Sequence, residues 1–110
     1  SLDDESCFIE VKSVTLSRLQ DISEFPDSVT LRGSKHLSLL TRLKIKGFRT
    51  IQIYLVQRSG TNYFKIAKDI DSAYFHSFQN AKKSGVEILV LHSLISKKGI
   101  KLSKKRPIIL

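Results

Sequence analysis

The chain is predicted to be an α/β domain in which a mixed sheet is flanked by two helices. Apolar runs of strand length alternate with two segments whose apolar residues recur at helical spacing. Their order is strand, helix, strand, strand, helix, strand, which is typical of strands joined by helical crossovers. At 110 residues, the chain is long enough for one core and too short for two domains.

Four apolar runs are predicted to be strands: residues 6–16, 50–58, 63–66 and 86–91. The run at 50–58 is almost continuously apolar or aromatic, as expected for a strand that is covered on both faces. Residues 17–24 are predicted to form a polar connection between the first strand and the first helix. Both helical crossovers are expected to join parallel strands, with the helices covering the sheet.

Each predicted helix has a capping residue at its start and a glycine after its end. Asp27 or Thr30 can cap the first helix, which Gly47 ends near residue 46. Asp71 is predicted to cap the second helix, which Gly85 ends. A side-chain oxygen at the start accepts a hydrogen bond from a free backbone N–H, and glycine readily takes the left-handed conformation that ends a helix.

The net charge of +9 is unevenly distributed along the chain. Residues 1–27 hold seven acidic side chains against Lys12 and Arg18, whereas the other residues hold seventeen basic side chains against three acidic ones. A positive field of this strength favours a polyanionic partner, with DNA or RNA as the first choice. A basic surface without such a partner is the alternative.

The composition also bears on location. No apolar run approaches the length of a membrane span, and the N-terminus lacks the basic-then-apolar pattern of a signal peptide. The single cysteine, Cys7, excludes an internal disulfide and fits a reducing compartment. We therefore expect a cytoplasmic protein with no membrane partner.

The first predicted strand carries the tripeptide Glu10-Val11-Lys12. Side chains alternate between the two faces of a strand, so Glu10 and Lys12 point the same way. An acid and a base side by side on an apolar strand are costly as packing, but they suit a site that holds a metal ion and a phosphate. The spacing E-x-K, with another acid nearby, is the pattern of metal-dependent phosphodiester cleavage. An ion pair on an exposed face, worth little energy, is the alternative.

Residues 25–36 gather charged side chains around the start of the first helix. Such a start offers free N–H groups and the positive end of the helix dipole to a phosphate. Arg32, Lys35 and His36 lie on adjacent turns of one face, and we predict that they contact nucleic acid. The alternative is a capped helix with a solvated basic face.

Two long motifs in this chain resemble one known family. Residues 8–16 read F-I-E-V-K-S-V-T-L, and residues 25–37 contain F-P-D-S-V-T followed by R-G-S-K-H-L. From residue 6 onward the chain resembles the sugar fermentation stimulation protein family. Shorter matches extend the resemblance: Val56-Gln57-Arg58, Asp69-Ile70-Asp71 with Tyr74, Ala81 and Gly85-Val86-Glu87.

The resemblance implies a restriction-endonuclease-like domain of the PD-(D/E)xK type, in a DNA-binding protein linked to the regulation of sugar catabolism. Glu10 and Lys12 then take the catalytic E and K positions, and Glu10 is a ligand of Mg²⁺. Family members are longer, so residues 1–110 correspond to the C-terminal nuclease-like part, without an OB-like half and the first elements of the nuclease-like core. The leading aspartate of the motif belongs to the preceding strand. Because Asp3 and Asp4 sit in an apparent turn, we expect that aspartate to be absent and this fragment to be inactive as an endonuclease.

The basic residues near the chain end extend the predicted nucleic-acid surface. Lys104, Lys105 and Arg106 can grip a DNA backbone, with a solvating tail as the alternative. The alternation around residues 100–102 favours a terminal strand at the sheet edge, after a turn at 97–99.

Gln57 and Arg58 end the second predicted strand near the expected end of the Glu10 strand. They are therefore predicted to lie at the rim of the site, and Arg58 to contact nucleic acid.

Three functions remain open from the sequence. The first is a DNA-binding domain with a nuclease-like fold, and the second is a Mg²⁺-dependent DNA nuclease that needs a segment absent from this chain. The third is a protein-interaction module that uses the apolar strand at 86–91 and the phenylalanine-rich second helix.

Overall fold

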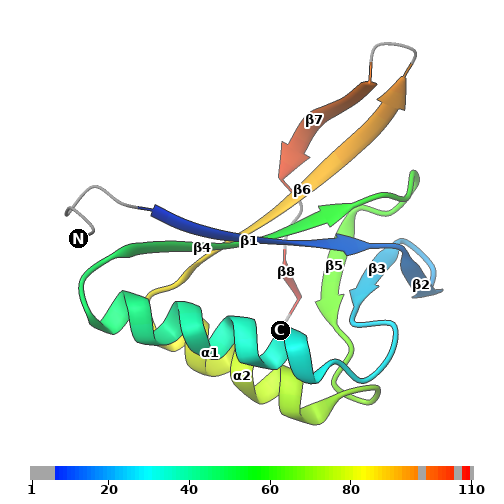
Figure 1. Cartoon of the computed structure of the whole chain (residues 1–110). Helices are drawn as coiled ribbons and strands as arrows, with labels where there is room; N and C mark the ends of the chain where they lie inside the picture. Colours follow the sequence, from blue (N-terminus) through cyan, green and yellow to red (C-terminus); the bar gives the residue numbers. More distant parts are fainter. Residues whose placement is uncertain (1–6, 97–98, 106–107, 110) are drawn as a thin grey trace.

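The computed structural model describes the backbone of residues 7–96, 99–105 and 108–109, and the side chains of residues 7–92. Within these residues it contains two four-stranded sheets and two helices, so the predicted α/β class is confirmed (Figure 1). The elements in chain order are β1 (Cys7–Val14), β2 (Leu16–Leu19), β3 (Ile22–Phe25), α1 (Leu31–Ile45), β4 (Arg49–Val56), β5 (Tyr63–Ile66), α2 (Ser72–Ser84), β6 (Glu87–Ser96), β7 (Gly99–Lys105) and β8 (Ile108–Ile109).

The first sheet has the strand order β1-β4-β6-β7. Its first three strands are parallel, and β7 returns antiparallel to β6. Strands β1 and β4 are parallel neighbours, as predicted, but β2 and β3 of the second sheet precede α1 in the connection between them. The register places Glu10 beside Gln52 and Lys12 beside Tyr54, so these four side chains share one face of the sheet.

The second sheet has the order β2-β3-β5-β8. The prediction of a polar connection at residues 17–24 is therefore wrong, because β2 and β3 form an antiparallel pair there. Strand β3 then runs parallel to β5, and α2 leads from β5 into β6 of the first sheet. The strands that were expected in one mixed sheet are thus divided between two.

A contact distant in sequence explains why the β2–β3 pair escaped prediction. Asp21 makes the turn with a positive φ of 69°. Its carboxylate accepts hydrogen bonds from the backbone N–H of Asn62 at 3.0 Å and from its Nδ2 at 2.8 Å. The short pair is thus stabilised by the loop before β5, and its own sequence carries little strand signal.

Both helices begin and end as the sequence predicts. Thr30, one of the two predicted alternatives, caps α1 by accepting a hydrogen bond from Gly33 N at 3.0 Å. Asp71 caps α2 by accepting one from Tyr74 N at 3.0 Å. Gly85 follows α2 with a φ of 102°, in the left-handed region that glycine adopts without strain.

The buried Asp71 carboxylate also ties the two helix starts together. While Oδ1 caps α2, Oδ2 accepts a hydrogen bond from the backbone N–H of Thr30 at 2.8 Å. A Cβ added at Gly33 would lie 2.9 Å from Thr30 side-chain atoms and 3.0 Å from the Tyr74 ring. A larger residue at this position would therefore crowd both the cap of α1 and the Tyr74 ring of α2.

The core lies between the first sheet, the second sheet and the two helices, which lie on the same side of the first sheet (Figure 1). Side chains from all three groups are fully buried in it: Val14, Leu37, Tyr54, Phe64, Tyr74 and Phe78. On the opposite face of β1, Ile9 and Val11 are about half exposed, at 53% and 50%.

The end of the chain forms the predicted edge strand, because β7 pairs with the long strand β6. Lys104 and Lys105 belong to β7, but their side chains lie outside the described residues, and Arg106 lies outside them altogether. The turn expected at residues 1–5 and most of the turn at 97–99 also lie outside. No helix in the described part of the chain is long and apolar enough to cross a membrane.

Because the Asp71 carboxylate accepts two hydrogen bonds, its replacement should lower the free energy of unfolding substantially. Asp71→Ala should lower the free energy of unfolding by about 2–3 kcal/mol, since one cap and a second buried hydrogen bond are lost. Urea denaturation monitored by circular dichroism measures this loss. Asp27→Ala is the matched control, because Asp27 is exposed and its one side-chain hydrogen bond within the described residues is to Ser28 at 3.5 Å. Equal losses in both variants would contradict the assignment.

Candidate functional site

Glu10, Lys12 and His36 form a compact cluster between β1 and α1. Lys12 Nζ lies 3.3 Å from Glu10 Oε1 and 3.0 Å from His36 Nδ1. His36 Nδ1 lies 3.2 Å from the same Glu10 oxygen. The side chains remain partly exposed, at 30% for Glu10 and 16% for Lys12, so a ligand can reach the cluster from solvent.

Local structure explains why these three side chains meet. The alternation along β1 turns Glu10 and Lys12 toward the helices, on the side of the buried Val14. His36 comes from the second turn of α1 and is followed by the fully buried Leu37, which fixes that helix against the sheet. The sequence placed His36 beside Arg32 and Lys35, whereas the structure places it against the acid and the base of β1.

The His36 imidazole can make only one of its two contacts with a given tautomer. If Nδ1 carries no proton, it accepts a hydrogen bond from the Lys12 ammonium. If Nδ1 is protonated, it donates to Glu10 Oε1 instead. An anion that binds at the cluster can therefore accept a hydrogen bond from either Lys12 or His36.

Two buried tyrosines and a glutamine lie beneath the cluster. The Tyr54 and Tyr74 hydroxyls are hydrogen-bonded at 2.5 Å, and burial raises the pKa of both phenols above its ordinary value. The Glu10 carboxylate is close enough to add to the raised pKa of Tyr74. Gln52 donates to the Glu10 carbonyl at 3.2 Å, and its own Oε1 has no partner among the described residues. Sequence reasoning assigned none of these three residues to the site.

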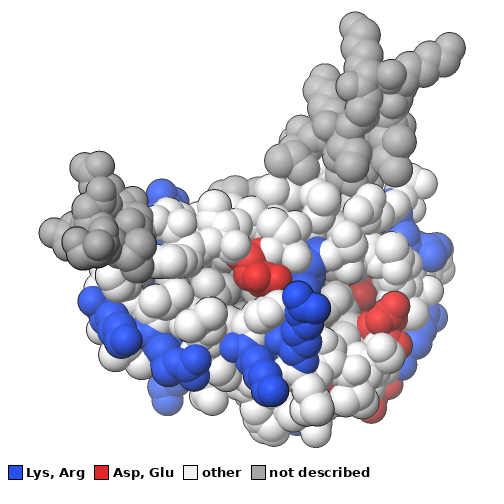
Figure 2. All heavy atoms as spheres, in the orientation of Figure 1, with Lys and Arg blue, Asp and Glu red and all other residues white. Residues whose placement is uncertain are grey.

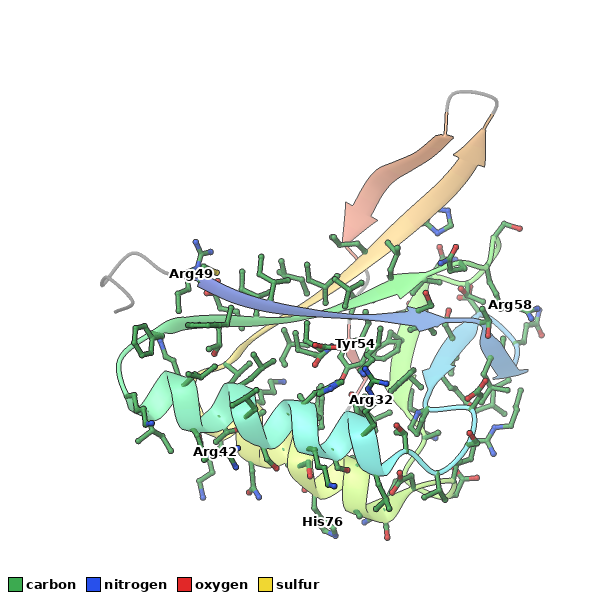
Figure 3. All side chains as sticks on the ribbon, in the orientation of Figure 1. Arg32, Arg42, Arg49, Tyr54, Arg58 and His76 are labelled. Atoms are coloured by element: carbon green, nitrogen blue, oxygen red, sulfur yellow. The ribbon has the colours of Figure 1, made fainter. Side chains whose placement is uncertain are left out.

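Other predicted residues lie farther from the cluster. Arg32 and Lys35 are exposed on the first turns of α1. Figure 3 shows Arg32 at the start of this helix, below β1. Arg58 lies at the far end of β1, where its Nη1 donates to the Thr15 carbonyl at 3.4 Å (Figure 3). Gln57 donates to Ser13 Oγ at 3.1 Å, and Ser13 alternates with Lys12 onto the opposite face of β1. The structure thus does not bring the two rim residues to Glu10.

Basic side chains cover the outer face of α1 next to this cluster. Figure 2 shows acidic atoms in the middle of this face of the molecule and basic atoms along the helix below them. Four exposed residues of α1 and its C-cap supply positive charge here: Arg32, Lys35, Arg42 and Lys46.

Comparison with known proteins decides the family. Residues 1–99 match the family model described as the sugar fermentation stimulation protein RE domain. The chain belongs to the sugar fermentation stimulation protein family. It is 48% identical over 105 residues to the sugar fermentation stimulation protein homolog of Pelagibacter ubique, covering 96% of this chain and 45% of the relative. The homolog of Pseudomonas aeruginosa is 41% identical over 102 residues, covering 92% and 43%.

A solved structure agrees with the fold. SfsA of Pyrococcus furiosus, solved in complex with Ca²⁺, superposes with a TM-score of 0.86 at 26% sequence identity, covering 94% of this chain and 45% of that one. The chain therefore spans less than half the length of the family members that it matches.

The described residues of this family member do not form a complete Mg²⁺ site. No group of three or more histidine, cysteine or acidic side chains could hold a metal within the part of the chain that the structure describes. Glu10 is the carboxylate of the cluster, and its Oε1 already contacts Lys12 and His36. Mg²⁺ prefers several oxygen ligands in near-ideal octahedral geometry, so these residues do not fit it on their own. Asp3 and Asp4 lie outside the described residues.

Because Tyr54 and Tyr74 are buried, we predict that their phenols ionise only at strongly alkaline pH. Since the folded-state pKa values of Tyr54 and Tyr74 are raised, their contribution to stability is complete below pH ~10 and is lost as the pH rises through the folded values. In a titration toward high pH, the phenolate absorbance of these two tyrosines should therefore appear above the ordinary range for tyrosine and together with alkaline unfolding.

Variants identify the late-titrating groups. Tyr54→Phe and Tyr74→Phe should each remove part of the late absorbance change, whereas Tyr63→Phe, at an exposed site, should leave that late part in place. A titration completed near pH ~10 with native circular dichroism would refute the assignment.

Proposed function

We propose that this chain is a DNA-binding domain with a nuclease-like fold that holds the phosphate backbone along α1. The observation that carries the proposal is a row of exposed cations with no acidic partner among the described residues: Arg32, Lys35, Arg42 and Lys46. Other arginines, such as Arg18 and Arg49, are neutralised by carboxylates. The unpaired ones are available for phosphates.

The spacing of these cations supports one continuous contact. Intervals of three, seven and four residues place them on one face of α1. A helical segment of this length extends about 20 Å. Such a row can follow several successive phosphates, and each neutralised phosphate releases condensed counterions.

The Glu10–Lys12–His36 cluster lies beside this row of cations. Lys12 and His36 surround the Glu10 carboxylate, which would otherwise repel a DNA phosphate. A phosphate that approaches from α1 can take a donor from Lys12 or His36. We extend the proposal to regulation of sugar catabolism genes in the cytoplasm, which the family resemblance suggests.

Salt dependence tests the DNA proposal. Affinity of the chain for a labelled duplex, measured by fluorescence anisotropy between about 50 and 200 mM salt, should fall steeply because several phosphates are contacted. Lys35→Ala and Arg42→Ala should each lower the slope of log affinity against log salt by about 1.

Lys83→Ala is the matched control, since it removes the same charge from an exposed position at the end of α2. It should change the slope less than either α1 variant. Equal slopes for all three variants would show that only net charge matters, and weak binding that is insensitive to salt would reject the proposal.

A second candidate is Mg²⁺-dependent DNA cleavage by the longer family protein. The contact of 3.3 Å between Lys12 and Glu10 supports it, together with the Ca²⁺ complex of the Pyrococcus furiosus relative. Glu10 would supply one oxygen ligand, and the others must come from outside the described residues. The metal would polarise the scissile phosphate, while Lys12 steadies charge that develops on it.

Cleavage assays separate the two candidates. A full-length family member should cleave DNA only with Mg²⁺, and alanine at its counterpart of Lys12 should lower kcat by about 100-fold or more. Alanine at its counterpart of Lys35 should mainly raise KM, because that lysine only binds. Equal cleavage by the parent and the Lys12 variant would remove this lysine from the mechanism.

The protein-interaction alternative has less support. Phe78 of α2 is fully buried, and β6 is covered on both edges by β4 and β7. The apolar residues that suggested this function mostly serve the core.

A further inference from the structure

A cavity of about 710 Å³ lies away from the Glu10 cluster, between the second sheet and the start of α2. Its volume is in the range of small-molecule sites. Its apolar walls are formed by Leu19 of β2, Ile66 of β5 and Phe75 of α2. Charged residues from four segments also line it, so apolar walls and a few polar groups converge on one space.

Glu24 of β3 is the most unusual residue of this cavity. Its side chain is only 1% exposed, and Arg18 Nε donates to its Oε2 at 2.6 Å. Its Oε1 is buried and has no hydrogen-bond partner among the described residues. A buried carboxylate oxygen without a donor is costly, so a bound group that donates an N–H to it would gain affinity.

The charged residues that line the cavity give Glu24 Oε1 no hydrogen bond in the described structure. Nη1 and Nη2 of Arg18 donate to the two oxygens of Asp69, at 2.7 and 2.8 Å, so Arg18 bridges Glu24 and Asp69. Lys65 is the cross-strand neighbour of Glu24, yet no ion pair joins them in the described structure. The Arg18–Asp69 pair therefore fixes Glu24 in place without satisfying its second oxygen.

Two basic residues also line this cavity. Lys65 and Lys68 both line it, and the Lys68 ammonium lies 5.0 Å from the centre of the Phe75 ring. A ligand that donates an N–H to Glu24 and carries an anion for these lysines would satisfy the acidic and the basic groups of the cavity. The apolar walls suit a flat, weakly hydrated body rather than a polyol, which needs many polar partners.

We propose that this cavity binds a nucleotide, with the base against Phe75 and Ile66, a base N–H donated to Glu24 Oε1, and the phosphate held by Lys65 and Lys68. A carboxylate that accepts from an exocyclic amine is an established mode of base recognition, and bases stack on aromatic rings. The nucleotide is either free or part of a single strand. The proposal does not depend on DNA binding along α1.

Titration of the isotope-labelled chain with nucleoside monophosphates, followed by amide NMR, tests the site. AMP, CMP, GMP and UMP are compared with the matching nucleosides and with inorganic phosphate. We expect saturable shifts at Glu24, Ile66, Lys68 and Phe75, with at least one nucleotide binding about tenfold tighter than its nucleoside or than phosphate. A short single-stranded oligonucleotide in a parallel titration distinguishes a strand from a free nucleotide as the source.

Variants decide which contacts matter. Lys68→Ala should weaken nucleotide binding about tenfold and leave nucleoside binding less affected. Phe75→Leu should weaken both. Glu24→Gln should change which base is preferred, and since it also disturbs the Arg18 pair, its fold is checked by its amide spectrum. Lys83→Ala, on the far end of α2, should bind like the parent chain.

Two results would overturn the proposal. One is the absence of saturable shifts at the cavity residues with every nucleotide and oligonucleotide. The other is inorganic phosphate that produces the same shifts at the same affinity, which would reduce the cavity to an anion site without base recognition.

Discussion

The carboxylate of Asp71 joins the starts of the two helices, and the position of the candidate site depends on this junction. One oxygen caps α2 and the other accepts the Thr30 N–H before α1. Gly33 lets α1 approach the Tyr74 ring at this point. The docked α1 then presents His36 to Glu10 and Lys12 on β1. A shift of α1 would separate the three side chains, because each comes from a rigid element.

The same junction places polar groups inside an otherwise apolar layer. Tyr54, Tyr74 and Gln52 lie between the sheet and the helices, next to Glu10. Hydrogen bonds offset much of the cost of burying them. The protein thus has a half-buried charged cluster on one side and, between the second sheet and α2, a separate cavity with an incompletely satisfied carboxylate.

Local signals in the sequence were sufficient for much of this fold. Thr30, Asp71 and Gly85 act through contacts within a few residues, so the helix ends could be predicted from residue type. The alternation along β1 likewise placed Glu10 and Lys12 on one face. The β2–β3 pair could not be predicted, because Asp21 makes its turn with help from Asn62. The contact of His36 with Lys12 also depends on how α1 docks, which no local pattern reveals.

We propose that α1 and the edge of the Glu10–Lys12–His36 cluster contact DNA phosphates. The most direct measurement is NMR mapping of the chain with and without a short DNA duplex. Amide signals along the exposed face of α1, and side-chain signals of Lys12 and His36, should shift in a saturable way, while those near Lys82 and Lys83 stay in place. Shifts centred on Lys82 and Lys83, or no saturable shifts on α1, would contradict it.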